Sequence, residues 1–197
     1  MSAGSAFRRL RPVLAALAAA CVAACAPRAE ELSVAREPPP VAADAPGAEQ
    51  ARELTEATED ILAFLRGETP FGRIRVADTV TLYLSPEGGG LRAAVPRERL
   101  RDPRGWELRS ADGRSAYAFA PPPGWTRLTA RVGRHFNCLE YPLASRYPEL
   151  ARLPHVGTRL EPAGAGSCLQ SWNLTFVFDA GSRPPVLVAV VRDQWEW

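Results

Sequence analysis

The chain has 197 residues, of which 24 are basic and 22 acidic, and it contains 15 glycines and 19 prolines. This length and composition are typical of one globular domain with a less ordered segment, and they exclude a large multidomain enzyme. All 24 basic residues are arginines. Sites that need a lysine are therefore excluded: the Walker P-loop, the Schiff-base or pyridoxal-phosphate attachment and the kinase phosphate-binding lysine.

Residues 1–24 have the parts of a secretion signal. A basic start with three arginines is followed by an apolar run over residues 12–24. This run is shorter than the roughly 20 helical residues that cross a bilayer, so we expect a cleaved signal peptide and not a permanent membrane span. Without the signal peptide, the chain contains 21 arginines and 22 acidic residues. The arginines are interleaved with the acids, so we expect no nucleic-acid binding.

The end of this segment, Val-Ala-Ala-Cys at residues 22–25, resembles the lipobox of bacterial lipoproteins. In that family a branched aliphatic residue and two small residues precede a cysteine that is diacylated and becomes the mature N-terminus. The resemblance implies that Cys25 is lipidated and holds the protein on a membrane. Ala26 implies delivery to the outer membrane, with the domain facing the periplasm or the cell surface. Cys21 is the weaker candidate because Ala18 stands where the aliphatic residue belongs. The other alternative is an ordinary secretory signal with two incidental cysteines.

Residues 25–50 are predicted to comprise the lipidated cysteine and a tether. Positions 26–50 contain seven alanines, five prolines and five acidic residues, and such a composition cannot bury a core. The folded domain is therefore expected at residues 51–197, a length that suffices for a hydrophobic core of its own.

The domain is predicted to begin with a helix. Leu54, Ala57, Ile61 and Leu65 recur at helical spacing, and Gly67 stands where a C-terminal cap is expected. One face of this helix is therefore expected to pack on a sheet.

Signals of period two follow the helix. Val80, Leu82 and Leu84 alternate with Thr79, Thr81 and Tyr83, and the glycine-rich turn at 86–90 predicts a hairpin whose second strand begins at Leu91. The further predicted elements are a hairpin over 106–109 and 117–120, a strand over 125–138, a short helix over 143–153, and strands over 168–178 and 186–191. The last run is apolar on both faces, as expected of a central strand.

One helix followed by at least six strands with short connections predicts an α+β domain. We expect the N-terminal helix to pack on a mostly antiparallel, curved sheet. The order of elements is similar to that of NTF2-like or cystatin-like folds, and this likeness concerns shape alone.

Four residues capable of metal or redox chemistry lie close together in the sequence: His135, Cys138, His155 and Cys168. In an exported protein, two cysteines besides the lipidated one form an even pair. The sequence therefore predicts a disulfide between Cys138 and Cys168, which joins the strand at Cys138 to the strand that begins at Cys168.

An alternative makes Cys168 a nucleophile with His155 as its base. The segments His-Val-Gly at 155–157 and Gly-Ser-Cys at 166–168 half resemble the His-Gly and Ser-x-Gly-Cys motifs of exported cell-wall cysteine transpeptidases. Ser167 stands where that family has glycine, and the family's arginine two residues after the cysteine is missing.

A second alternative is a zinc site formed by the same two cysteines and two histidines. His135 and Cys138 have a spacing suited to chelation, but His155 and Cys168 are too far apart for the usual close pair. We therefore expect no metal and no cofactor.

The C-terminal residues continue the last strand. If alternation holds, Asp193, Trp195 and Trp197 share one face. Together with Trp172, Asp193 and Trp195 are candidates to line a ligand pocket in which the indoles stack on an apolar or sugar ligand. The alternative is that the tryptophans cover an open end of the core.

These features predict a membrane-anchored bacterial lipoprotein of the cell envelope with a disulfide-linked, non-catalytic domain that binds or scaffolds. Its expected partners are the membrane, through the lipid, and an envelope protein, a glycan or a small ligand. The alternatives are the cell-wall thiol transpeptidase or hydrolase that uses Cys168 and His155, and an NTF2-like pocket protein.

Overall fold

The computed structural model describes residues 47–85, 90–165 and 167–193. The predicted signal peptide, Cys25, nearly all of the tether, the tip of the first hairpin and Trp195 lie outside these residues. Among the residues described, no helix is long and apolar enough to cross a membrane.

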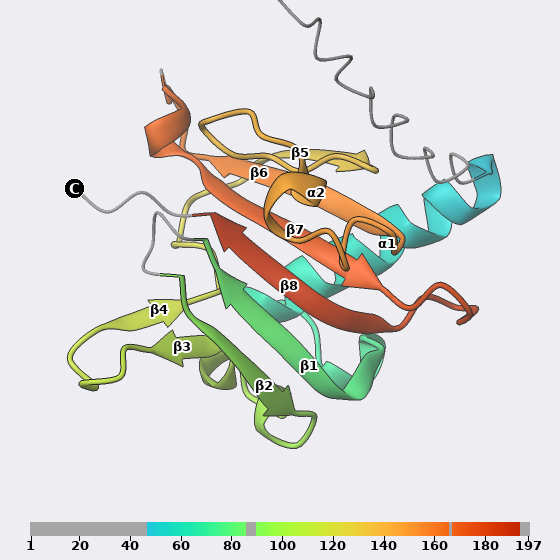
Figure 1. The fold of residues 1–197 in the computed structure, drawn as a ribbon, viewed down its shortest axis with the longest axis horizontal. Coiled ribbons are helices and arrows are strands. Elements are labelled where there is room, and N and C mark those ends of the chain that lie inside the picture. Colours follow the sequence, from blue (N-terminus) through green and yellow to red (C-terminus); the bar gives the residue numbers. More distant parts are fainter. Residues whose placement is uncertain (1–46, 86–89, 166, 194–197) are drawn as a thin grey trace, which may run out of the picture. The chain divides into compact units, whose positions relative to one another are not determined.

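Six strands form one sheet in the order β2-β1-β8-β7-β6-β5 (Figure 1). Neighbouring strands are antiparallel except β1 and β8, which run parallel. The prediction of an α+β domain with a mostly antiparallel sheet is thus confirmed. The strands are β1 (Val76–Leu84), β2 (Arg92–Pro96), β5 (Arg127–Val132), β6 (His155–Glu161), β7 (Trp172–Phe178) and β8 (Leu187–Asp193).

Helix α1 (Ala48–Leu65) lies along one face of the sheet. Its apolar side packs against strand residues that alternate as predicted, such as Val80 and Leu82. The helix begins at Ala48, before the predicted domain boundary at residue 51. It ends where expected, because Gly67 has a φ of 75° and its N–H donates to the carbonyl of Phe64, a conformation that glycine adopts without strain.

A separate two-stranded hairpin, β3 (Glu107–Arg109) with β4 (Ala116–Ala118), confirms the second predicted hairpin. Trp106 just before β3 and Phe119 just after β4 are fully buried in the main core. The connections include short 3-10 turns, which are η1 (Phe71–Arg73), η3 (Arg99–Arg101), η4 (Pro103–Gly105) and η5 (Cys168–Gln170).

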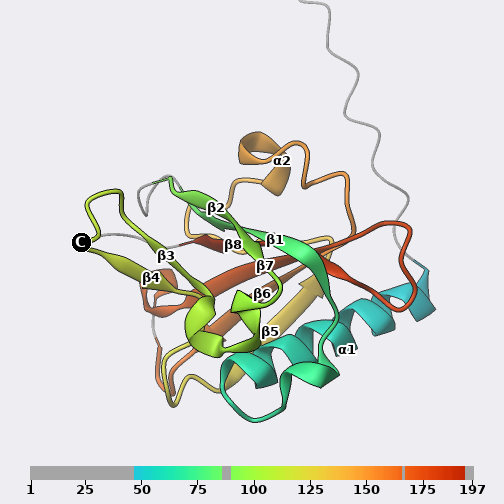
Figure 2. The ribbon, with the colours of Figure 1, turned by 90° about the horizontal axis from the view of Figure 1, so that it is seen from below.

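The opposite face of the sheet is covered by residues 133–154, which we call the covering segment. It contains the one-turn helix α2 (Leu143–Arg146), and Figure 2 shows α1 and α2 on opposite sides of the sheet. Leu143, Tyr147 and Leu150 of this segment pack on Val177 and Val191 in a second hydrophobic cluster. The central strands β7 and β8 are therefore buried on both faces, and β8 is apolar on both faces up to Val191, as predicted.

Several predicted bounds were wrong. The helix expected over 143–153 ends at Arg146, because Pro148 disfavours helical backbone at Tyr147. The strand expected over 125–138 spans only Arg127–Val132. The strand expected to begin at Cys168 begins at Trp172, since residues 168–170 form η5. Strand β6 was not predicted at all, and it joins β5 to β7.

Candidate functional site

A hollow of about 170 Å³ lies at the end of the sheet where β7 begins and β8 ends. Strand and loop residues from three separate parts of the chain line it. We call it the Trp–Arg pocket and define it by Trp125, Ser171, Trp172, Asn173, Arg192 and Asp193. Cys168 and Leu169 of η5 also border it.

Arg192 is the unusual member of this pocket because its charge is buried. Only 6% of the residue is exposed, although it follows an apolar run in a central strand. Its guanidinium carbon lies 3.8 Å from the centre of the Trp172 ring, and its Nη1 donates a hydrogen bond to the carbonyl of Ala118. Burial lowers the pKa of Arg192 to about 10, so the side chain is charged at neutral pH.

No carboxylate of the described residues forms an ion pair with Arg192. Asp193 follows it directly, but alternation along β8 turns that carboxylate to the opposite face of the sheet. A buried cation without a charged partner is costly. The Trp172 ring and the Ala118 carbonyl compensate part of this cost, and the electrostatic effect of Tyr117 also favours the charged form.

Two tryptophans form the aromatic part of the pocket. Trp125 and Trp172 meet edge to face with ring centres 6.2 Å apart. The Trp172 Nε1 donates to the carbonyl of Phe119 at 3.3 Å, which ties the ring to the segment after β4. Trp172 thus lies between Trp125 and Arg192. These contacts leave the Trp172 side chain little conformational freedom.

Trp172 and Asp193, two of the three residues predicted to line a pocket, both border this hollow. The third, Trp195, lies outside the described residues. Trp125 and Arg192 were not predicted from the sequence. A signal existed for Arg192, since a charge inside an otherwise apolar central strand demands a specific partner.

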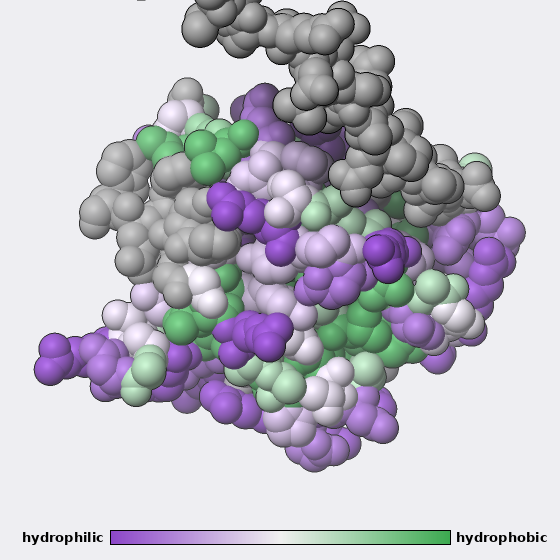
Figure 3. Space-filling view, viewed as in Figure 1, coloured by the Kyte–Doolittle hydropathy of each residue, from purple (hydrophilic) through white to green (hydrophobic). Residues whose placement is uncertain are grey.

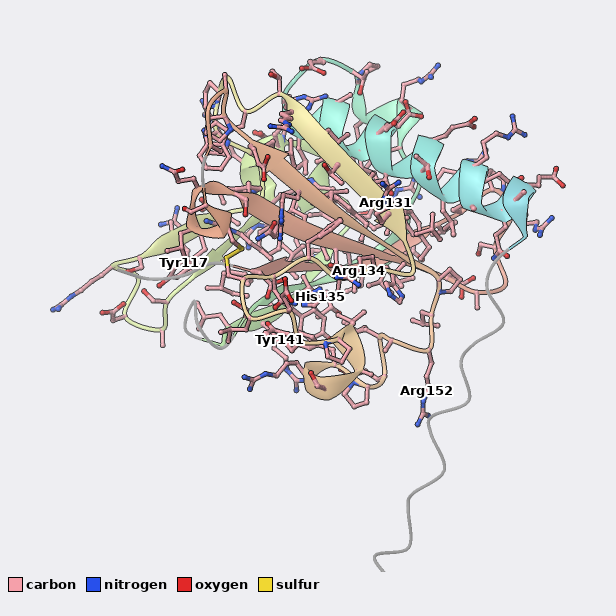
Figure 4. The ribbon with its side chains drawn as sticks, turned by 90° about the horizontal axis from the view of Figure 1, so that it is seen from above. Tyr117, Arg131, Arg134, His135, Tyr141 and Arg152 are labelled. Carbon is pink, nitrogen blue, oxygen red and sulfur yellow. A yellow bond between two sulfur atoms is a disulfide. The ribbon has the colours of Figure 1, made fainter. Side chains whose placement is uncertain are left out.

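The disulfide predicted between Cys138 and Cys168 is confirmed, with an S–S distance of 2.09 Å. It joins the covering segment to η5 at the border of the pocket, and not two strands as expected (Figure 4, yellow bond). Behind it, the Arg159 Nε donates to Asn173 Oδ1 at 3.3 Å, and its Nη2 lies 3.8 Å from the sulfur of Cys168.

Because the sulfur of Cys168 is bonded to Cys138, Cys168 carries no thiolate in this structure. The proposed base, His155, has its Nδ1 2.9 Å from the carbonyl of Leu153. The described part of the chain also contains no group of three or more His, Cys, Asp or Glu side chains placed to hold a metal ion.

A second polar cluster lies behind the pocket, under the covering segment. His135 Nδ1 is 2.7 Å from Thr175 Oγ1, and His135 Nε2 is 3.3 Å from Asp193 Oδ2. The Tyr141 hydroxyl donates to Asp193 Oδ1 at 2.7 Å. Figure 4 shows His135 and Tyr141 side by side beneath the sheet. One neutral tautomer of His135 fits both contacts: Nε2–H faces the carboxylate, and Nδ1 accepts from the threonine hydroxyl.

The order hydroxyl, imidazole and carboxylate is that of a catalytic triad, but the burial argues against catalysis. Thr175 is 0% exposed, and His135 and Asp193 are each 7% exposed. A nucleophile must reach a substrate, and this hydroxyl lies between the sheet and the covering segment. The cluster therefore serves to hold the covering segment on the sheet, and it also fixes the Asp193 end of the pocket.

Gly157 allows the covering segment to approach so closely. A Cβ at this position would lie 2.2 Å from the Arg134 carbonyl oxygen. The backbone next to His135 can therefore rest directly on β6 only because residue 157 lacks a side chain.

An apolar rim flanks the disulfide. Leu139 and Leu169, each next to a bonded cysteine, are 54% and 43% exposed. They are the large hydrophobic side chains that the described surface leaves open. Figure 3 shows hydrophobic surface at the upper left, in the region of η5.

Comparisons with protein-family models, with curated proteins and with solved structures found no match to this chain.

Proposed function

We propose that this chain is a lipid-anchored protein of the bacterial envelope whose domain binds a small ligand in the Trp–Arg pocket and does not catalyse. The lipobox resemblance at residues 22–25 supports the anchor. The disulfide supports export, because disulfides persist in oxidising compartments.

The observation that carries the binding function is the pairing of two indoles with a buried guanidinium at one hollow. Ligand sites are concave and mostly apolar, with a few convergent polar groups that fix orientation. Trp125 and Trp172 supply the apolar surface, and Arg192 and Asn173 supply polar groups. A scaffold domain would need neither a hollow nor a buried charge.

Two findings favour binding over catalysis. The sulfur of Cys168 is used in the disulfide, and the histidine and carboxylate nearest to the pocket are committed to the buried cluster. The NTF2-like or cystatin-like fold remains part of this proposal as a likeness of shape alone.

Replacing the lipidated cysteine tests the anchor. In the Cys25→Ala variant, the precursor is expected to remain unacylated, and the protein is expected to leave the membrane fraction. Metabolic labelling with a radioactive fatty acid, followed by fractionation, measures both effects. The matched variant Cys21→Ala should behave like the parent. Continued acylation of Cys25→Ala would move the anchor to Cys21, and labelling of neither protein would contradict the lipoprotein proposal.

Replacing one wall of the pocket tests the binding function. The full chain is screened by ligand-detected NMR against acidic, neutral and basic compounds that contain one aromatic ring. We expect at least one class to bind and Trp125→Ala to weaken that binding about tenfold, because a stacked aromatic contact is lost with its buried area. Leu139→Ala, which removes an exposed apolar side chain outside the pocket, is the matched control. Absence of binding, or equal binding by both variants, would overturn the proposal.

A further inference from the structure

We propose that the ligand of the Trp–Arg pocket is a carboxylate attached to one ring-sized apolar group, with the carboxylate on Arg192 and the ring beside Trp125. This inference rests on the proposed binding function and adds the chemical class of the ligand. It is carried by the burial of Arg192, the free edge of its guanidinium and the size of the hollow.

The guanidinium has one edge left for a ligand. Its Nη1 donates to the Ala118 carbonyl. The N–H groups on Nε and Nη2 have no hydrogen-bond partner among the described residues. These two groups form the parallel fork that a carboxylate accepts with both oxygens. The stack on Trp172 holds the plane of the fork in place, so little side-chain freedom is lost when an anion binds.

The charge of Arg192 gives an anion its advantage over a neutral ligand. The side chain is 6% exposed and has no described carboxylate as an ion-pair partner. The protein already bears the cost of burying this cation. An anion that enters the pocket meets the Nε and Nη2 edge of a desolvated positive charge, and hydrogen bonds to a charged group are stronger than those between neutral groups.

Asp193 is the negative group at the same pocket, and its contacts point elsewhere. Its Oδ1 accepts from Tyr141 and its Oδ2 faces His135. The amide of Asn173 lies on the same face of the sheet as Asp193, because the two residues are paired across β7 and β8. Its oxygen accepts from Arg159 and Ser171, so Arg192 is the donor that the proposal uses.

The size of the hollow limits the apolar part of the ligand. Its volume is about 170 Å³, and a cavity of roughly 150 Å³ in another protein holds one benzene molecule. One six-membered ring with a short acidic arm therefore fits in the hollow. Trp125 and Trp172 offer faces and edges for that ring.

The test compares two probes of equal shape. Phenylacetate and phenylacetamide have nearly the same shape, and at neutral pH the first carries an anionic carboxylate where the second carries a neutral amide. Their affinities for the full lipidated chain in detergent are measured by tryptophan fluorescence and ligand-detected NMR. We expect phenylacetate to bind at least about tenfold more tightly, the ratio that corresponds to one charge-assisted hydrogen bond. Equal affinities, or tighter binding of the amide, would overturn the carboxylate assignment.

Two arginine variants locate the effect. Arg192→Gln keeps a donor near Ala118 but removes the charge, and it should bind the two probes equally. Arg131→Gln removes an exposed arginine of β5 outside the pocket, and it should keep the preference for phenylacetate. A preference that survives in Arg192→Gln would overturn the role of this residue.

The outcomes separate this inference from the function on which it rests. If both probes bind equally and Trp125→Ala weakens both, the pocket binds ligands but the carboxylate class is wrong. If neither probe binds, the carboxylate inference fails, and the wider compound screen decides the binding function. If Arg192→Gln does not fold, which its thermal unfolding curve would show, the ratio of the two probes on the parent chain still decides the ligand class.

Discussion

The double variant Cys138→Ser/Cys168→Ser is expected to lose about 3.5 kcal/mol of its free energy of unfolding, because the disulfide closes a long loop in the unfolded chain. The bonded residues are 30 positions apart in the sequence. Cross-linking them removes conformations from the unfolded state and leaves the folded state unchanged. Typical domains are stable by only about 5–15 kcal/mol, so this loss is a large share of the total.

Urea unfolding of the parent chain and of the double variant measures the difference. Reductant should lower the unfolding midpoint of the parent. It should not change the midpoint of the double variant, which therefore serves as the control for the effect of the reductant itself. Thiol alkylation gives an independent check by intact mass. Without reductant, neither Cys138 nor Cys168 should be labelled even in the unfolded parent. Labelling of both would contradict the disulfide and return Cys168 to the candidates for a nucleophile.

The disulfide also borders the ligand pocket, which extends this prediction to binding. Cys168 and Leu169 lie at the hollow, and their turn η5 is tied to the covering segment by the S–S bond. Loss of the disulfide frees η5, which forms one side of the pocket, from the covering segment. A rigid wall lowers the entropic cost of binding, so the double variant is expected to bind ligands more weakly even where it remains folded.

Local pattern predicted the elements whose residues alternate strictly or are apolar throughout. Val80, Leu82 and Leu84 of β1 point to the core, and β8 is buried on both faces, as the sequence indicated. Strand β6 was not predicted because Gly157 interrupts its alternation of apolar and polar side chains. The need for glycine at this position comes from the Arg134 backbone, which packs directly on it. A contact between segments cannot be seen in a local pattern.

The parallel pairing of β1 with β8 could not be predicted for the same reason. These strands lie at opposite ends of the domain sequence, and their partnership depends on how the whole chain returns to its start. Hairpins such as β1 with β2 are set by a nearby turn, so they were accessible from the sequence. Long-range pairings are set by the packing of the whole domain.

In the candidate site, too, local pattern predicted some features and long-range packing determined the others. Alternation placed Asp193 on one face of the last strand, and the structure puts its carboxylate under the covering segment with His135 and Tyr141. Trp172 packs with the opposite face. The two residues border one hollow because the sheet ends there. Trp125 reaches the same hollow from a distant loop, and only the tertiary fold brings it there.

Acidification from pH 7 to pH 4 is expected to lower the free energy of unfolding by about 3 kcal/mol through His135. Burial, and to a smaller extent the charge of His155, lower the pKa of His135 from 6.5 to about 4. As the pH falls from 6.5, the unfolded chain takes up a proton at this residue, and the folded chain does so only as the pH approaches 4. The stabilisation is therefore complete above pH 6.5 and is lost as the pH falls toward 4.

Urea unfolding at several pH values measures this loss in the parent and in His135→Asn. The variant lacks the titrating group, so the steepest part of the pH dependence should disappear. His155→Asn separates the two causes: most of the loss should persist in this variant, because burial lowers the pKa of His135 more than the charge of His155 does. Thr175, Tyr141 and Asp193 contact His135, and of these only Asp193 carries a charge that would favour a protonated imidazole. The charge of His155 acts in the opposite direction. If the parent became more stable than His135→Asn on acidification, the 3.3 Å contact with Asp193 would be a buried ion pair. The covering segment would then be held by charge and not by the neutral hydrogen bond from Thr175.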